Sequence, residues 1–203
     1  DIGKLIITND VEVVSESALW ACGATEIVIG DGVKQLKRAC FDECFNMRKI
    51  TIGTGVEEID DWAFSECNKL EEIHIYSLKA WCEIEFSNEG ANPLYKNEYT
   101  TSTDRNLYLN GTKIEGTLTL PDDVSVIKDH AFINLDSITE VYIPQTVISC
   151  GKAAFQSCDN LEKFIDPLAS TDGSYFVIIN KLAAVATNRP ITNLTISDSI
   201  TSI

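Results

Sequence analysis

Cysteine is the residue type in this sequence with the widest chemical scope, because its thiolate can bind metals, attack electrophiles and form disulfides. The chain has seven cysteines and two histidines. No Cys-x-x-Cys pair occurs, no cysteine pair is followed by spaced histidines, and neither His74 nor His130 lies in a His-Glu-x-x-His motif. The spacing therefore does not indicate a zinc site.

Paired aspartates are the second group that could do chemistry. Asp60-Asp61 and Asp122-Asp123 could bind calcium, but neither pair continues into the Asp-x-Asp-x-Asp-Gly loop that such sites use. Both pairs occupy turn-prone segments, where aspartate is locally favoured. The sequence also lacks nucleophile-elbow, phosphate-loop and dinucleotide-binding glycine motifs. We therefore expect no catalytic residue, no metal site and no cofactor, and predict that the protein is not an enzyme.

Most of these cysteines, histidines and aspartates lie within or beside a sequence repeat. The stretch 56–75 has apolar or small residues at Val56, Ile59, Ala63, Phe64, Cys67, Leu70, Ile73 and Ile75. The same pattern recurs at 33–52, 124–143 and 147–164, with 23 residues between neighbouring copies, and a shortened copy spans 11–29. A fixed period of this size predicts a solenoid of stacked coils.

The repeat Val-x-x-Ile-x-x-x-Ala-Phe-x-x-Cys-x-x-Leu-x-x-Ile-x-Ile resembles the BspA-like leucine-rich repeat, found in surface proteins of bacteria and some protozoa. The segment 78–117, with its Trp-Cys, Asn-Pro-Leu-Tyr and Leu-Tyr-Leu-Asn-Gly landmarks, looks like the insert of these proteins. The Asp-Gly-Ser-Tyr segment that begins at Asp172 is similar to their hairpin insert. The resemblance implies an α/β repeat fold. The fold that it implies is a curved leucine-rich-repeat solenoid with a parallel sheet on its concave side and short 3₁₀ or α turns on its convex side.

We predict one continuous solenoid over residues 1–203. Regular repeats cover 1–77 and 118–165, one long irregular insert covers 78–117, and 166–203 hold an irregular repeat with the start of a further one. Expected strands cover 5–7, 26–29, 49–52, 72–75, 118–120, 141–143 and 194–196, where β-branched residues alternate. Asn110-Gly111 predicts a hairpin between 107–109 and 112–114.

The repeat register also gives the cysteines a structural interpretation. Cys22, Cys44, Cys67 and Cys158 share one repeat position, and Cys40 occupies the slot of Ala63, Ala131 and Ala154. Free cysteine in such core slots behaves as a small hydrophobic residue. A disulfide between Cys44 and Cys67 stays open, because adjacent coils lie about 4.8 Å apart. Only Cys82 has no place in the repeat. The ring positions Phe41, Phe64, Phe132 and Phe155 are expected to stack as a ladder.

Alternation along the strands predicts a binding surface. If Ile50 and Ile52 point inward, their neighbours point to the concave face, which solenoids commonly use for binding. The candidate residues on this face are Lys49, Thr51, Glu72, His74, Tyr76, Thr119, Glu140 and Tyr142. The insert adds the aromatic residues Trp81, Tyr95, Tyr99 and Tyr108. The alternative is an ordinary solvated sheet face without a ligand. Trp20 either covers the short first coil or takes part in a contact.

Composition restricts the class of partner. The formal net charge is −15, and the acidic residues are spread along the chain, whereas nucleic acids and anionic membranes require clustered lysine and arginine. No apolar run approaches the roughly 20 residues of a membrane span. We expect another protein, on a host or partner cell, as the partner, with no nucleic acid and no direct membrane insertion. The resemblance implies an extracellular or cell-surface adhesion module. The alternative is a structural spacer within a larger surface protein.

Overall fold

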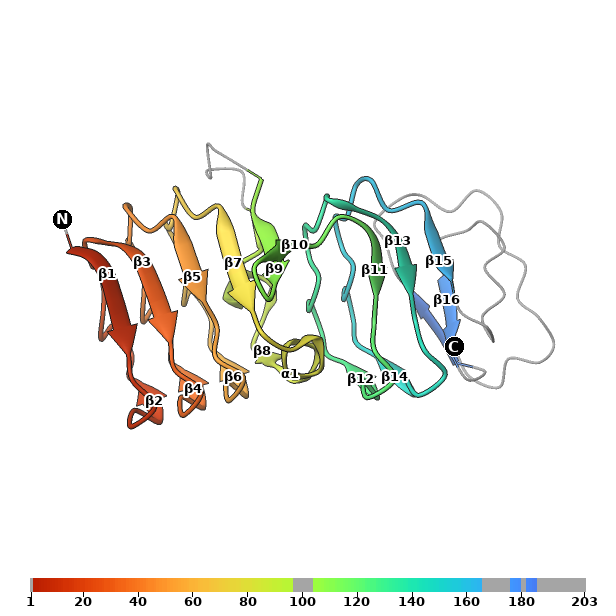
Figure 1. The fold of residues 1–203 in the computed structure, drawn as a ribbon, viewed down its shortest axis with the longest axis horizontal. Helices are drawn as coiled ribbons and strands as arrows, with labels where there is room; N and C mark the ends of the chain where they lie inside the picture. The colour runs from red at the N-terminus through yellow and green to blue at the C-terminus, as the bar shows by residue number, and fades with distance from the viewer. Residues whose placement is uncertain (1, 97–103, 166–175, 180–181, 186–203) are drawn as a thin grey trace.

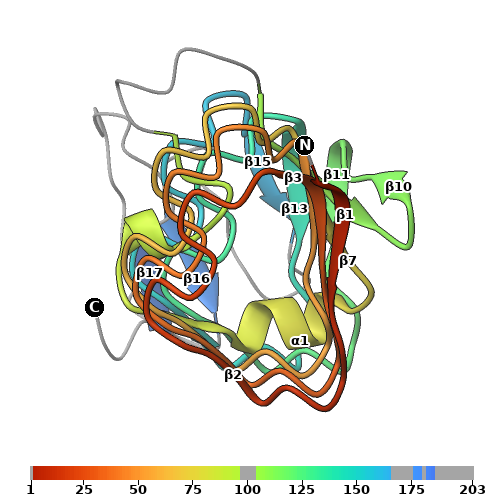
Figure 2. The ribbon, with the colours of Figure 1, turned by 90° about the vertical axis from the view of Figure 1, so that its left-hand side faces the viewer.

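The chain winds into a stack of coils, with β1 at one end and β15 near the other (Figure 1). The computed structural model describes residues 2–96, 104–165, 176–179 and 182–185. Seen along the stack, each regular coil contributes one longer strand to one side and a two-residue strand further along its path (Figure 2). The predicted solenoid of stacked parallel strands is confirmed.

The longer strands of the first coils form one sheet. Its parallel members are β1 (Ile2–Ile7), β3 (Ala24–Ile29), β5 (Lys49–Thr51), β7 (Glu72–Ile75) and β9 (Asn106–Leu109). The core residues Ile27, Ile50 and Ile73 are paired across it in one row. The expected strands at 5–7, 26–29, 49–52 and 72–75 are therefore confirmed, with small differences at their ends.

Short strands form a second parallel ladder, made of β2 (Val13–Val14), β4 (Gln35–Leu36), β6 (Glu58–Ile59) and β8 (Glu85–Phe86). The later coils repeat this arrangement with β11 (Gly116–Thr119), β13 (Ile138–Tyr142) and β15 (Lys163–Ile165), and with β12 (Val126–Ile127) and β14 (Ser149–Cys150). An antiparallel pair, β16 (Phe176–Ile179) and β17 (Leu182–Val185), follows the Asp172 segment, where the resemblance implied a hairpin insert. The strand expected at 194–196 lies outside the described residues.

A break divides the main sheet in two. β10 (Thr112–Lys113) folds back antiparallel on β9 and ends the first sheet, and β11 begins the second. Asn110 and Gly111 connect β9 to β10 with φ of 51° and 82°, as a two-residue hairpin with left-handed central residues requires. The hairpin predicted from Asn110-Gly111 is confirmed. Its consequence, that an antiparallel strand interrupts the parallel stack, was not foreseen from the sequence. We call the gap between β10 and β11 the sheet break.

The Ala-Phe segments form consecutive turns, and the 3₁₀ or α turns expected there are wrong for the described coils. Ala39 and Glu43 have left-handed backbones, with φ of 54° and 58°. Their N–H groups donate to the carbonyl oxygens of Asp61 and Ser65 in the next coil, at 3.1 and 3.0 Å. A helix would direct these donors along its own axis, so the turns preserve the bonding between coils.

The helices of the described residues lie within the predicted insert. They are α1 (Leu78–Glu83) and the 3₁₀ helix η1 (Glu89–Ala91). In the described part of the chain, no helix has the length and apolar character that crossing a bilayer requires. β8 and β9 lie in the same segment and pair with β6 and β7, so both ladders continue through residues that break the sequence pattern.

Rings and thiols fill the core between the ladders. Phe41 stacks on Phe64 with centroids 5.6 Å apart, and Phe132 stacks on Phe155 at 5.2 Å, so the expected ladder occurs as two pairs. All seven cysteines are free, which excludes the Cys44–Cys67 disulfide from this structure. Each of three thiols donates to a carbonyl oxygen of the preceding coil. The pairs are Cys44 to Leu19 at 3.4 Å, Cys67 to Phe41 at 3.2 Å and Cys158 to Phe132 at 3.0 Å.

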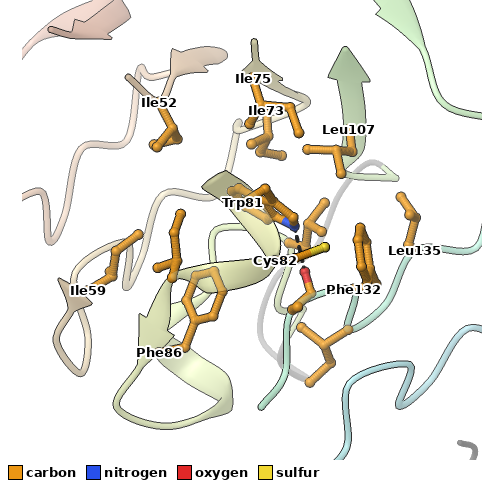
Figure 3. Close-up of a cluster of buried hydrophobic side chains, with 14 of the residues drawn as sticks. Ile52, Ile59, Ile73, Ile75, Trp81, Cys82, Phe86, Leu107, Phe132 and Leu135 are labelled. Atoms are coloured by element: carbon orange, nitrogen blue, oxygen red, sulfur yellow. Dashed lines mark hydrogen bonds between the residues drawn. The ribbon is translucent and has the colours of Figure 1, made fainter. Parts of the chain in front are cut away.

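Trp81 on α1 joins the coils on either side of the sheet break. Its indole is 1% exposed and packs edge-on against Phe86, with centroids 5.5 Å apart (Figure 3). Its Nε1 donates to the Ala131 carbonyl oxygen at 2.8 Å, and Asn92 donates to the His130 carbonyl oxygen at 2.9 Å. The expectation that Trp81 is available to a partner is wrong, because Ser77 caps α1 and the helix turns Trp81 inward.

The thiol of Cys40 gives a stability prediction at alkaline pH. Burial raises its pKa to about 12, whereas an unfolded cysteine titrates near about 8.5. The folded chain therefore keeps a proton that the unfolded chain loses, so Cys40 stabilises the fold below about pH 8.5 and this stabilisation is lost as the pH rises toward 12. We expect the free energy of unfolding in urea to fall over this range. Cys40→Ala should make this fall less steep, by up to about 1.4 kcal/mol of unfolding free energy per pH unit.

The Cys40→Ala variant is a mild replacement, because Ala63, Ala131 and Ala154 fill the same slot in other coils. Tyrosine and lysine side chains also ionise in this range, but they do so in both proteins. Their contributions to the pH dependence of stability therefore cancel when the two proteins are compared. Identical slopes for the two proteins between pH 9 and 12 would contradict the burial of this thiol.

Truncating Trp81 should destabilise the protein strongly. Trp81→Ala removes a buried indole and its hydrogen bond, and we expect a loss of about 3–5 kcal/mol in the free energy of unfolding. Trp20→Ala is the matched control, because Trp20 is 56% exposed, and it should change stability by about 0.5 kcal/mol or less. Urea denaturation followed by circular dichroism measures both. A loss below about 1 kcal/mol for Trp81→Ala would show that Trp81 does not join the coils as described.

Candidate binding surface

The outward side chains of β1, β3, β5, β7 and β9 form what we call the strand face. Strand register arranges them in two rows across the sheet. The first row is Lys4, Glu26, Lys49, Glu72 and Asn106, and the second is Ile6, Val28, Thr51, His74 and Tyr108.

Charges of alternating sign occupy the first row. Lys4 Nζ lies 3.0 Å from Glu26 Oε1, and Lys49 Nζ lies 4.0 Å from Glu72 Oε2. All four side chains are partly exposed, and such surface pairs contribute about 0–1 kcal/mol each. Lys49 and Glu72 were predicted on this face, and both are available to a partner there.

Thr51 is the predicted contact residue that the second row hides. It is only 4% exposed, so its expected exposure is wrong. Its direct neighbours in the adjacent strands are Val28, which has the same size, and the larger His74. Side chains packed on both sides of the threonine leave little of it accessible to solvent. Thr51 therefore supports the strand face and does not offer its own surface.

Glu72, His74 and Tyr108 form a compact group that we call the aromatic cluster. The rings of His74 and Tyr108 stack with centroids 4.5 Å apart and planes 5° from parallel. His74 Nε2 lies 2.8 Å from Glu72 Oε2, so it donates a hydrogen bond when the carboxylate is ionised. Stacked rings of this kind contribute about 0.5–1.5 kcal/mol beyond their buried area. The cluster is thus fixed in position before any partner arrives.

Carboxylates gather around the phenol of Tyr108. Partial burial raises its pKa above the ordinary value, and the charges of Glu72, Glu115 and Glu71 raise it further. The aromatic cluster therefore lies in a negative potential, which would attract a cationic group.

The other predicted contact residues lie in different surroundings. Tyr76 follows β7 and is 58% exposed, whereas Tyr95 packs partly against the core. Tyr99 lies outside the described residues. The partly or fully exposed Thr119, Glu140 and Tyr142 belong to β11 and β13, beyond the sheet break. The structure thus brings together Lys49, Glu72, His74 and Tyr108, and it separates these residues from the second group. The single strip expected from the sequence is two patches.

Sequence reasoning missed a pocket at the sheet break, which we call the break groove. Its volume is about 220 Å³. Its lining consists of Leu78, Leu109, Thr112, Lys113, Ile114, Glu115, Thr117, Leu118 and Thr119. The signal that could have located it is the Asn110-Gly111 hairpin directly before a parallel strand. The groove is smaller than the roughly 300–1,000 Å³ of small-molecule sites, so it suits one or two side chains better than a cofactor.

Metal chemistry has no visible support in the residues that the structure describes, where no group of three or more histidine, cysteine or acidic side chains could hold an ion. The aspartate pairs at 60–61 and 122–123 belong to no such group. What the strand face offers is a rigid, partly exposed aromatic and charged surface, which is suited to recognition of another molecule.

The sequence of the chain matches a known protein family. A family model described as the BspA type leucine rich repeat region matches residues 1–115 and 101–203, in six copies. No curated protein sequence matches the chain.

Solved structures with similar folds include bacterial leucine-rich repeat proteins. A Treponema (T. pallidum) leucine rich repeat protein is 18% identical with a TM-score of 0.38, over 80% of this chain and 64% of that one. The pneumococcal vaccine antigen PcpA is 19% identical with a TM-score of 0.48, over 89% and 45%. A leucine rich cell surface protein from Faecalibacterium prausnitzii is 18% identical with a TM-score of 0.29, over 80% and 60%. The chain thus spans less than two thirds of each of these proteins.

The environment of Tyr108 can be tested by titration. We expect its phenol to ionise above the ordinary value of about 10, and Glu72→Gln or Glu115→Gln to lower the pKa, because each removes a nearby negative charge. NMR of ring-labelled tyrosine follows the ionisation directly. Glu16→Gln is the control, because Glu16 does not raise the pKa of Tyr108. A Tyr108 pKa below 10, or one unchanged by both substitutions, would contradict the proposed clustering of charge.

Proposed function

The chain belongs to the BspA-type leucine-rich repeat family, and from this premise we propose that it is a non-catalytic protein-binding module of a secreted or surface-exposed protein. The family's occurrence in bacterial surface proteins supports this location. In this proposal the strand face lines the concave side of the solenoid. Residues 78–117 are then the insert that adds Tyr108 to that face.

The observation that carries the proposal is the aromatic cluster. His74 and Tyr108 are stacked, His74 is fixed by Glu72, and the exposed Tyr76 follows directly on β7. Aromatic side chains bring a large contact area at low cost in conformational entropy, and they are enriched among the residues that dominate binding energy. Because the rings are already held by stacking and hydrogen bonding, a partner would lose little free energy in ordering them.

Charge defines the kind of partner. The chain carries a net charge of −15, and Glu71, Glu72 and Glu115 surround Tyr108. A protein with a basic surface is therefore the partner that fits. Complementary charge accelerates association and makes it depend on salt. Adhesion to a host or partner cell is the role that this surface would serve.

The proposal is tested with a panel of purified extracellular-matrix proteins and the intact chain. We expect at least one to bind, with an association rate that falls as salt is raised from 50 to 500 mM. The variant with both His74→Ala and Tyr108→Ala should weaken binding by about tenfold or more, since loss of hot-spot side chains costs about 2 kcal/mol or more. Trp20→Ala, which changes an exposed tryptophan outside the strand face, should leave the affinity unchanged.

The alternative function, a structural spacer, predicts a different outcome. A spacer would bind none of the panel proteins above background. Binding that survives the double variant and is lost in Trp20→Ala would place the contact elsewhere and overturn the assignment of the strand face.

A further inference from the structure

β11 is an edge strand in the middle of the stack, because its sheet runs β11-β13-β15 and begins at the break. Gly116 N–H donates to the Ser137 carbonyl oxygen at 2.9 Å, and Leu120 N–H donates to the Tyr142 carbonyl oxygen at 3.0 Å. Peptide groups in a strand alternate in direction. Thr117 and Thr119 alternate with the residues that bond to β13. Their N–H and C=O groups therefore point away from β13 and toward the break groove.

The opposite wall of the break groove is the hairpin strand β10. Thr112 pairs with Leu109, and Ile114 N–H donates to the Leu107 carbonyl oxygen at 2.8 Å, so these peptide groups face β9. The peptide group of Lys113 between them faces the other way. Lys113 and both threonines of β11 line the same groove, so outward-facing peptide groups border it on two sides.

Apolar side chains line the groove between these walls. Leu78, Ile114 and Leu118 are buried at 6%, 9% and 2% exposure, and Leu109 packs partly against the core. Acidic groups lie at the rim. The Glu115 side chain is 70% exposed and its Oε2 lies 4.0 Å from Lys113 Nζ, and Glu140 accepts a hydrogen bond from the Thr117 hydroxyl at 3.2 Å. The two carboxylates outnumber the Lys113 ammonium group there.

We propose that the break groove binds an extended segment of a partner protein, which adds to β11 as a strand and in which apolar residues alternate with basic residues. Peptide groups of the segment pair with those of Thr117 and Thr119, as in β-strand addition. Side chains beside Leu118 enter the apolar floor. Side chains beside the two threonines point outward, where Glu115 and Glu140 accept positive charge.

The volume and charge of the groove favour this occupant. About 220 Å³ holds one or two apolar side chains, and the acidic rim selects against an acidic segment. The inference rests on the proposed function, because it assumes a protein partner, yet apart from Glu115, whose charge also reaches Tyr108, it uses residues that the strand face does not include. The two can therefore fail separately.

A capped seven-residue peptide in which lysine alternates with valine is the probe. Titrated into the ¹⁵N-labelled full chain, it should shift the amide resonances of Thr117 and Thr119 and slow their hydrogen exchange. Two control peptides are matched in length: one has glutamate in place of lysine, and the other is methylated on alternate peptide nitrogens, which blocks strand pairing. We expect each control to bind at least tenfold more weakly.

A backbone substitution in β11 tests the strand addition itself. Thr119→Pro removes an N–H that makes no bond to β13, and proline is tolerated on edge strands, so the fold should persist while peptide affinity falls tenfold or more. Thr119→Val keeps the N–H and should change the affinity less than twofold. The double variant of His74 and Tyr108 should bind the peptide as the unmodified chain does.

The outcomes separate the two proposals. An unperturbed spectrum of Thr117 and Thr119, or equal affinity for the alternating peptide and its methylated analogue, overturns strand addition at the break groove and leaves the strand face untouched. Should Thr119→Pro fail to fold, the comparison of the three peptides on the unmodified chain still decides the question. Peptide binding that is lost in the His74 and Tyr108 variant would move the site to the strand face and also overturn the inference.

Discussion

Hydrogen bonding between consecutive coils is the constraint on which the rest of this structure depends. A peptide group buried in the stack needs a partner, and the next coil supplies it only if the chain returns to the same place after each turn. Rows such as Ile27, Ile50 and Ile73 are the result. Close approach of the backbones follows as well: a Cβ on Gly55 would lie 1.8 Å from the Asp31 carbonyl oxygen, so a larger residue could not occupy that corner.

The repeat length and the residue types at each repeat position made much of this fold predictable from the sequence. Repeated apolar slots specify which side chains face inward, so the strands, the buried cysteines and the phenylalanine pairs follow. The conformation of the turns could not be predicted in this way. Ala39 and Glu43 adopt left-handed backbones because their N–H groups bond to the next coil, and not because of a local preference. The burial of Thr51 was missed because it depends on how the side chains of the adjacent strands pack beside it, which the alternation of one strand does not show. Trp81 was misjudged because the capped helix that directs it inward lies outside the repeat.

The sheet break shows what happens where the bonding between coils is interrupted. The hairpin leaves β11 without a strand on one side, and side chains replace the missing ladder. Trp81 and Asn92 donate to carbonyl oxygens of the following coil, and Lys96 pairs with Asp136 at 2.8 Å. The same interruption separates the two predicted groups of contact residues and creates the groove between them. The candidate sites are therefore a consequence of how the stack is broken and rejoined.

The positions of the three tryptophans give this molecule an optical property. Trp81 is enclosed at the joint between the two sheets, whereas Trp20 and Trp62 are 56% and 53% exposed, and Arg38 lies over the Trp62 ring. An indole in an apolar enclosure emits at shorter wavelength than one in water and is shielded from ionic quenchers. When iodide quenches Trp20 and Trp62, the remaining blue-shifted fluorescence comes from Trp81. The chain thus carries an intrinsic reporter for the opening of the joint, separate from unfolding at either end.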